Sequence, residues 1–561
     1  MNNSNASFFS IWRNTPLKRS ILLSIPTSII IKHIGKLDKD YHYLQLLREK
    51  NIPIVYAIDN LLIYSLYDKH PLKHLISHVI LSISIYLNHL SLFVNQPTPP
   101  QIYGLAMEYL GYQTIKLPTS IKFVQIKTMY IPFLVDLLYA GVETLYLNES
   151  DYPLTMNALP HSLTKLVLRF SPPLKNFNLN VIPSSVTNLS LEHLKHDNII
   201  DFGHLPNLVY LRLYHCLGQL DFTKGLQKLK YLRTSGVLNS TNLYIPKSVT
   251  YLDTKLHNHF TSSDLPPNLV HLKVHYFQKS TKRQSTTLEN NIFPNTLKSL
   301  IIKGDGYTNF YSDSIPNQLA KFTNVNTSKK EYANVPIPPN CTDLSFSISH
   351  LYLTTQLPTI HQHIRKLKIV NPISSIPPDY FYNGSLSKLT FEYYQPISPN
   401  LIPNTVTNLS IKFNHPIEKD VIPTSVTKLS LDHDSTSISP IIIPSNVQSL
   451  SFTSSKYLTK QLDLPKSVLK LKFQQLDTTS FQEFIHQDNI KHVNTLVFIK
   501  DLIDFQNSLE MQSTRYNPLK FPSTKRIKKT IKFPRDSIIY YFENNQCTFE
   551  NIFSHCHPPV K

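Results

Sequence analysis

The chain has 561 residues, of which 41% are hydrophobic and 11% aromatic, so it can form a buried core and is not intrinsically disordered. Its length exceeds that of an ordinary domain several-fold, which leaves either several domains or one long repeat array. The formal charge of +19 favours acidic partners, and 11 glycines leave little material for glycine-rich phosphate loops.

The first predicted region, residues 1–112, shows no repeat and is expected to be mainly helical. Phe8 to Leu23 has apolar residues at helical spacing. This segment is expected either to cap a following array or to act as an F-box-like helical module, although the leading Leu-Pro signature is missing. The apolar window from Leu75 to Val94 contains His78 and Asn88, so we predict a buried helix there and no membrane span.

Residues 113–475 repeat a short motif. Three copies read IPSSVTNLSL, IPNTVTNLSI and IPTSVTKLSL, starting at Ile182, Ile402 and Ile422. Their template is a proline, two residues, an apolar residue, two residues, a leucine, one residue and a final apolar residue. The prolines at positions 403, 423, 444 and 465 lie 20, 21 and 21 residues apart. A period near 21, over about 15–17 copies, predicts a repeat solenoid.

The template also predicts how each repeat folds. Leu189 and Leu191 alternate with Asn188 and Ser190 as a β-strand requires, so the leucines should face a core and the polar residues should face away. One strand cannot bury this face alone, so successive repeats should stack into a parallel sheet. We expect each proline where a strand begins, since it would break a ladder hydrogen bond further inside. The polar returns are too short for full helices, which favours extended or 3₁₀ returns.

These repeats resemble those of the FNIP-repeat proteins, a family similar to leucine-rich-repeat proteins. The matching residues are Phe413, Asn414, Ile422 and Pro423, and a second set is Phe177, Asn178, Ile182 and Pro183. The resemblance covers residues 118–473 and implies a leucine-rich-repeat-like solenoid with its parallel sheet on the concave face. It also implies an interaction scaffold without catalytic residues. The family usually carries a glycine after the strand, where this chain has Glu192, Lys412 or Asp432.

Residues 476–561 are predicted to hold degenerate repeats and a C-terminal cap, with strands near residues 494–499 and 537–542. The basic segment from Lys525 to Arg535 is either a nuclear-import signal or a solvated surface. Cys547 lacks the nearby second ligand of a zinc site, and we predict no metal and no cofactor. Four cysteines and the absence of a secretory signal predict an intracellular, cytoplasmic protein.

The outer face of the predicted strands holds the candidate binding residues. Basic residues outnumber acidic ones at the positions before the leucine, after it and after the last apolar residue. The acidic entries are Glu192, Asp253, Asp343, Glu392 and Asp432, and the only tyrosines assigned to this face are Tyr210, Tyr214 and Tyr251. The basic residues predicted to contact a partner are Lys165, Arg212, Lys273, Lys366, Lys368, Lys388, Lys428, Lys470 and Lys472.

The sequence contains neither a phosphate-binding loop nor a G-x-S-x-G nucleophile motif, and we predict no enzymatic activity. The predicted function is a protein-binding scaffold that recognises an acidic or extended protein partner along the basic strand face, without membrane attachment. One alternative is a substrate adaptor of a ubiquitin ligase, docked through the N-terminal helices. Another is nucleic-acid binding by the basic residues, although few aromatic side chains are expected there for base stacking.

Overall fold

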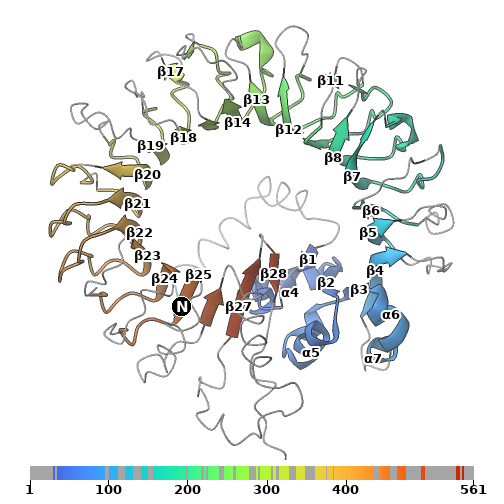
Figure 1. Cartoon of the computed structure of the whole chain (residues 1–561), viewed down its shortest axis with the longest axis horizontal. Coiled ribbons are helices and arrows are strands. Elements are labelled where there is room, and N and C mark those ends of the chain that lie inside the picture. The colour runs from blue at the N-terminus through green and yellow to red at the C-terminus, as the bar shows by residue number, and fades with distance from the viewer. Residues whose placement is uncertain are drawn as a thin grey trace, which may run out of the picture. The chain divides into compact units, whose positions relative to one another are not determined.

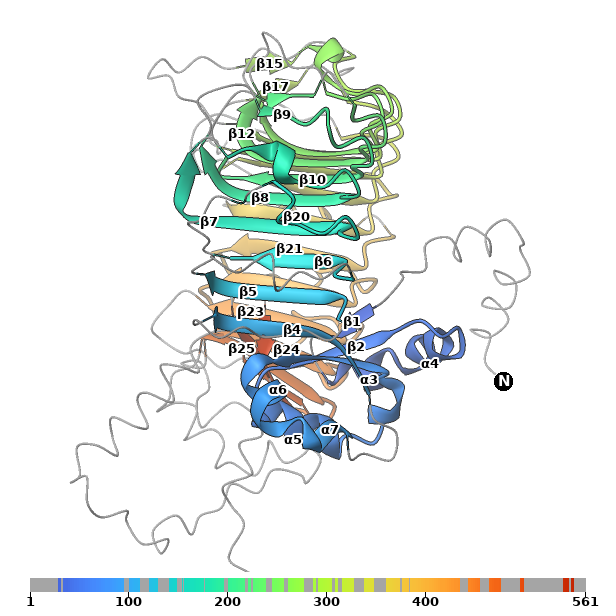
Figure 2. The same cartoon turned by 90° about the vertical axis from the view of Figure 1, so that its right-hand side faces the viewer.

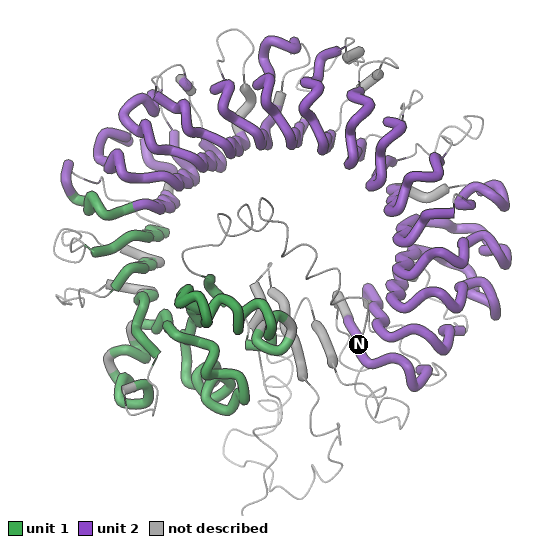
Figure 3. Tube along the Cα trace, turned by 180° about the vertical axis from the view of Figure 1, so that it is seen from behind, with its two compact units in different colours: residues 1–152, 158–163 green, residues 153–157, 164–561 purple. Residues whose placement is uncertain are grey.

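The computed structural model divides into two compact units, residues 1–152 with 158–163 and residues 153–157 with 164–561 (Figure 3). Phe8 to Leu23 and Lys525 to Arg535 lie outside the described residues. The F-box-like and nuclear-import hypotheses that involve these segments therefore stay predictions. The residues that the structure describes are 29–31, 34–94, 100–110, 121–129, 141–148, 154, 156–175, 177–195, 200–216, 220–222, 225–238, 245–256, 261–276, 286–288, 291–304, 308–310, 315–326, 337–347, 360–373, 376–382, 384–433, 442–454, 464–475, 495–498, 538–543 and 546–548.

The smaller unit is a parallel sheet with short helices between its strands. The strands pair in chain order from β1 to β6. They are β1 (Ile29–Ile31), β2 (Ile54–Ile58), β3 (His78–Ser82), β4 (Gln101–Leu110), β5 (Phe123–Met129) and β6 (Thr144–Leu147). The helices are α3 (Lys36–Lys39), α4 (Tyr41–Glu49), α5 (Leu61–Lys69), α6 (Ile83–His89), α7 (Ser91–Val94) and the 3₁₀ helix η1 (Lys73–Leu75).

The expected mainly helical N-terminal region is thus only partly helical. In the apolar window 75–94, the predicted single helix is wrong, because its first half forms β3 and only its second half forms α6 and α7. Val79, Ile80 and Leu81 are all buried, as in a parallel strand covered on both faces. No helix in the described part of the chain is long and apolar enough to cross a membrane.

The larger unit is a long parallel sheet with one strand per repeat (Figures 1 and 2). Within this unit the strands lie along the inner edge of a curve, and the return segments lie along its outer edge (Figure 1). Its strands are β7 (Lys165–Lys175), β8 (Asn188–Lys195), β10 (Tyr210–Tyr214), β12 (Tyr231–Leu238), β13 (Tyr251–Leu256), β14 (His271–Tyr276), β16 (Ser299–Gly304), β18 (Lys321–Asn326), β19 (Asp343–Ser347), β20 (Lys366–Ile373), β21 (Lys388–Tyr393), β22 (Asn408–Phe413), β23 (Lys428–His433), β24 (Ser449–Ser454), β25 (Lys470–Gln475), β26 (Thr495–Phe498) and β27 (Ile538–Glu543), and β28 (Gln546–Thr548) pairs with β27 in the antiparallel direction.

The described parts of the returns in the larger unit contain no α-helix, as predicted for extended or 3₁₀ returns. Two contain single 3₁₀ turns, η2 (Leu179–Val181) and η3 (Ser262–Asp264), and four short strands form two further parallel pairs. These are β9 (Ile200–Asp201) with β11 (Leu220–Asp221) and β15 (Thr286–Leu288) with β17 (Thr308–Phe310). The larger unit is therefore a leucine-rich-repeat-like solenoid, which confirms the predicted fold class.

Most repeats enter their strand through a turn closed by the proline carbonyl. The Val406 N–H donates to the Pro403 carbonyl at 3.0 Å, and the Val426 N–H donates to that of Pro423 at 3.1 Å. Since β22 begins only at Asn408, the expectation that the proline opens the strand is wrong. The proline instead opens the turn, where its fixed φ is suited to the first bend.

A left-handed residue lies three positions before several of these prolines. Asn400 and Asp420 have φ of 68° and 64°, and Asn157 and Asn291 have φ of 64° and 58°. Asparagine and aspartate tolerate this region better than other residues with a side chain. The positions that follow are apolar and buried, as at Leu401. The recurring Asn or Asp therefore sets the backbone direction that brings two apolar residues into the core before each turn.

Side-chain hydrogen bonds join several turns to the preceding one. The Thr427 Oγ1 hydroxyl donates to the Thr407 carbonyl at 3.3 Å, and the Thr407 hydroxyl donates to the Ser387 carbonyl at 3.2 Å. Asn446 Nδ2 donates to the Thr424 carbonyl at 2.9 Å, and equivalent bonds start from Asn207, Asn268 and Asn340. Backbone carbonyls at the edge of the stack are thereby satisfied by the next repeat. The abundance of Ser, Thr and Asn in this chain follows from this arrangement.

Candidate functional site

The exposed strand face of the larger unit consists of three rows of side chains. The first row precedes the repeat leucine, the second follows it, and the third lies two residues further along. In β22 and β23, Leu409 and Leu429 are buried, while Ser410 lies beside Ser430 in the second row. Because the strands are in register, equivalent residues of successive repeats are neighbours about 4.8 Å apart.

The predicted lysines lie on this face. Lys366, Lys388, Lys428 and Lys470 belong to the first row, and Lys368 and Lys472 belong to the second. We call these six residues the lysine segment. Lys366 and Lys388 are direct register neighbours, so the structure brings the predicted group of Lys366, Lys368 and Lys388 together on β20 and β21. Lys366 Nζ lies 3.8 Å from the exposed Asp343 carboxylate, and Lys165 is half-buried on β7.

Arg212 and Lys273 occupy the face as predicted, but each is ion-paired. The carboxylates that pair with them belong to Glu192 and Asp253, which the sequence pattern placed on the exposed face. That expectation is wrong, because the two side chains are only 4% and 5% exposed. Long basic side chains from the neighbouring strands cover them, so the face is less basic here than its sequence indicates.

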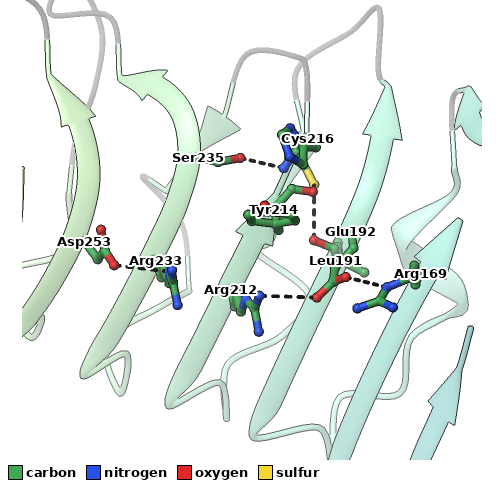
Figure 4. Close-up of polar contacts among 10 residues, drawn as sticks. Arg169, Leu191, Glu192, Arg212, Tyr214, Cys216, Arg233, Ser235 and Asp253 are labelled. Carbon is green, nitrogen blue, oxygen red and sulfur yellow. Dashed lines mark hydrogen bonds and ion pairs between the residues drawn. The ribbon is translucent and has the colours of Figure 1, made fainter. Parts of the chain in front are cut away.

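Glu192 lies between two arginines (Figure 4). Its Oε2 accepts a hydrogen bond from Arg169 Nε at 2.6 Å, and its Oε1 lies 3.5 Å from Arg212 Nη2. The Arg212 guanidinium also lies over the Tyr214 ring, 5.4 Å from its centre. Strand β8 continues beyond Glu192 to Lys195, and within it His193 has a left-handed φ of 62°. Lys412 and Asp432 lie within their strands, so none of these three positions requires the family's glycine.

Asp253 lies between cations of both neighbouring strands. Its Oδ2 is 3.1 Å from Arg233 Nε and 3.0 Å from Lys273 Nζ, and its Oδ1 is 3.5 Å from His275 Nε2. Burial alone would raise the pKa of this carboxyl, but hydrogen bonds from His275 and Lys273 and the charge of Arg233 together lower it below its ordinary value. Asp253 therefore stays ionised and orients the cations around it.

A stack of tyrosines fills the first row beside these ion pairs. The rings of Tyr210 and Tyr231 are 4.2 Å apart and nearly parallel, as are those of Tyr231 and Tyr251, and His271 continues the row at 6.0 Å. The hydroxyl groups are hydrogen-bonded in series from Tyr210 to Tyr251, and burial is the main cause that raises the pKa of Tyr210 and Tyr231. We call Tyr210, Arg212, Tyr231, Arg233 and Tyr251 the tyrosine–arginine segment.

The sequence pattern did not assign Tyr231 and Arg233 to the exposed face. Their repeat has Leu226 where most repeats have proline, although the Leu229 N–H still donates to the Leu226 carbonyl at 3.1 Å. The remaining template, an apolar residue followed three positions later by Leu232, would have identified the strand. Counting only proline-led repeats therefore missed the middle of the tyrosine stack.

The tyrosine stack affects whether the exposed strand face can bind nucleic-acid bases. The ring of Tyr231 is stacked on both faces, by Tyr210 and Tyr251. Base stacking needs exposed ring faces. The central tyrosine therefore offers no such platform, and nucleic-acid binding stays a prediction. Within the described ranges, no group of three or more His, Cys, Asp and Glu side chains is arranged to hold a metal ion.

The parallel sheet, the buried leucines and the short returns define a leucine-rich-repeat-like solenoid. Solved structures of this class are similar to the chain. They include CroV588, a circular leucine-rich-repeat protein (18% identity, TM-score 0.44, covering 87% of this chain and 72% of that one). They also include YopM of Yersinia enterocolitica (16%, 0.26, 82% and 85%) and the functional domain of InlJ of Listeria monocytogenes (17%, 0.29, 56% and 63%).

One part of the larger unit matches a known repeat family. Residues 413–455 match the FNIP Repeat family, which confirms the resemblance seen in the sequence. Asp420 in its left-handed turn and Pro423 both lie inside this matched range. No curated protein matches the chain.

Proposed function

We propose that this protein is a non-catalytic scaffold that binds a protein partner through the exposed strand face of its larger unit. The observation that carries the proposal is the tyrosine–arginine segment. Tyrosine and arginine are enriched among the residues that dominate protein interfaces, because they combine a large contact area with hydrogen-bonding groups. Here stacking and ion pairs already hold them in place, so little side-chain entropy is lost on binding.

The lysine segment supplies a second, electrostatic part of the same face. Lys366, Lys368 and Lys388 carry three like charges on two adjacent strands, and only Asp343 lies within ion-pair distance of one of them in the described residues. Such a patch attracts an acidic partner over about a Debye length and mainly speeds association. The proposed partner is therefore a protein with an acidic or extended binding segment, recognised inside the cell.

The test compares matched substitutions on and off the strand face. Partners are first isolated by affinity purification of the whole chain, and the binding of a purified partner is then measured with each variant. Tyr231→Ala is expected to weaken binding at least tenfold, as for a central interface tyrosine. Its control is Tyr382→Ala, since Tyr382 is exposed on a return segment. Equal affinity of the two variants would place the binding site elsewhere.

The charge contribution is tested in the same assay. Replacing Lys366, Lys368 and Lys388 together with glutamate should slow association and remove most of its salt dependence. The control is the triple replacement of lysines 247, 419 and 466, which are exposed on turns and returns. If both triple variants keep the wild-type salt dependence, the lysine segment serves only solubility.

A further inference from the structure

Two arginines lie side by side in the second row of the exposed strand face. Arg212 of β10 and Arg233 of β12 are register partners on adjacent strands. Like charges that face each other directly across neighbouring strands destabilise a sheet. Neither β10 nor β12 carries an acidic residue. The pair therefore concentrates positive charge in the middle of the tyrosine–arginine segment (Figure 4).

Buried carboxylates hold the two guanidinium groups from outside the pair. Glu192 contacts Arg212 from the β8 side, and Asp253 contacts Arg233 from the β13 side. Each carboxylate is also shared with a second cation, Arg169 or Lys273. The cluster therefore has four basic side chains and two carboxylates, Glu192 and Asp253, and its net charge is +2. The Arg212 and Arg233 side chains remain 33% and 38% exposed, so a ligand can reach part of each from solvent.

Hydrogen-bonding capacity is also left over at this pair. Arg212 has five N–H donors, yet its carboxylate contact is 3.5 Å long and its buried Nε has no hydrogen-bond partner. Ser190 is the register neighbour of Arg212, and its buried Oγ is likewise unpaired. A polar group that is buried without a partner costs free energy. Because these two atoms are buried, a ligand from solvent can use only the exposed part of the Arg212 side chain, where the long contact with Glu192 leaves N–H donors available.

We propose that Arg212 and Arg233 together bind a phosphomonoester group on a protein partner, such as a phosphorylated serine or threonine. A phosphomonoester carries a charge of about −1.5 to −2 at neutral pH, which balances the two residual positive charges. A carboxylate carries only one charge and offers two oxygens in place of three. Arginine forks bind phosphate oxygens in bidentate fashion, and here two such forks are neighbours.

This inference rests on the proposed function, because it identifies the chemistry of the partner segment that the strand face binds. A nucleic-acid phosphodiester fits less well, since it carries a single charge and the central tyrosine of the stack leaves no ring face for its bases. The hydroxyl series from Tyr210 to Tyr251 runs beside the arginines and is suited to backbone groups of an extended peptide.

The test uses fluorescein-labelled peptide pools with a fixed central residue and degenerate flanks. Three pools carry phosphoserine, serine or aspartate at the centre, and a fourth probe is a labelled single-stranded oligonucleotide. Fluorescence anisotropy with the whole chain is expected to show at least about tenfold tighter binding of the phosphoserine pool than of the other three probes. Equal binding of the phosphoserine and aspartate pools, or preferred binding of the oligonucleotide, would overturn the proposal.

Matched variants distinguish phosphate recognition by the two arginines from a purely structural role. Arg212→Gln and Arg233→Gln should each remove most of the preference for phosphoserine, whereas Lys366→Gln in the lysine segment should change it less than about twofold. Arg233→Lys keeps the charge that Asp253 requires but loses the planar fork, so it should retain wild-type stability and lose affinity for the phosphoserine pool. If Arg233→Lys or both glutamine variants keep the full preference, the arginines have a structural role only.

An experiment on the isolated partner distinguishes the proposed phosphate site from the proposed scaffold function. Phosphatase treatment of the partner should abolish its binding to the wild-type chain. A treated partner that binds normally, and whose binding still depends on Tyr231, would refute the phosphate site and leave the scaffold function standing. Binding that depends on neither treatment nor any strand-face residue would refute both.

Discussion

Replacing Asp253 with asparagine removes one negative charge and leaves Arg233 and Lys273 without their shared counter-ion. Breaking a fully buried ion pair costs about 3–5 kcal/mol, and an exposed pair contributes about 0–1 kcal/mol. The Asp253 carboxylate is 5% exposed, but its partners are 38% and 21% exposed and keep some hydration. We therefore expect Asp253→Asn to lower the free energy of unfolding by about 1–3 kcal/mol.

Asp343 provides the matched control. It is also an aspartate on the exposed strand face, but its contact with Lys366 is 3.8 Å long and the side chains are 32% and 58% exposed. Asp343→Asn should therefore change stability by less than about 0.5 kcal/mol. Repeat arrays can unfold in parts, so hydrogen exchange of the β13 and β19 amides is measured together with denaturant unfolding.

The pH dependence of stability provides a second test of the role of Asp253. The pKa of Asp253 is lower in the folded chain than its ordinary value of 3.8, so the carboxylate stabilises the fold above that pH. The contribution is lost as the pH falls through the lowered value. The difference between wild type and Asp253→Asn should thus shrink below pH 3.8. Equal costs for the two aspartates, or a difference that persists at the lowest pH, would show that Asp253 does not hold these cations.

Leu429→Ala should lower the free energy of unfolding by about 2–5 kcal/mol, because Leu429 is buried between adjacent repeats. Ser430→Ala, on the other strand face, should change it by no more than about 0.5 kcal/mol. Similar losses for the two variants in denaturant melts would mean that the strand faces are reversed. Asn400→Gly should preserve the melting temperature and Asn400→Val should lower it, since φ is 68° there; an unchanged valine variant would contradict the turn geometry. Burial raises the pKa of Cys216 and Cys341 to about 11, so peptide mapping after alkylation at neutral pH should find both thiols unmodified in the folded chain.

Most of the repeat architecture could be predicted from the sequence because one local pattern recurs. Leu189, Leu409 and Leu429 follow the same template, and all three are buried on parallel strands as expected. The predicted start of the strand was wrong, because the proline, Pro403 in one repeat, lies in the preceding turn and β22 begins only at Asn408. Val406 is buried in that turn, and burial there gives the same apolar signal as a strand.

The candidate site was only partly predictable, because burial there depends on neighbouring strands. Glu192 and Asp253 have the alternation of exposed residues and become buried only where arginine and lysine side chains of adjacent repeats cover them. The residue pattern along one strand does not show which side chains of adjacent strands will bury its polar residues. The strands β2 and β3 were missed for another reason, since their repeats have helical returns and lack the proline turn that marks the rest of the chain.

The hydrogen bonds that run from one turn to the next have a consequence for how this chain can change in length. Thr427 bonds to Thr407, and Thr407 bonds to Ser387, through the same atoms each time. Because the acceptor is always a backbone carbonyl, repeats that carry Thr or Ser at this position can follow any other repeat, and duplication of such a repeat preserves the bond. A partial insertion within the turn would break two such bonds, whereas extra residues in a return segment would break none. Changes in the number of repeats and in the length of the return segments can thus alter the size of the binding surface, and with it the partner, without disrupting the turns.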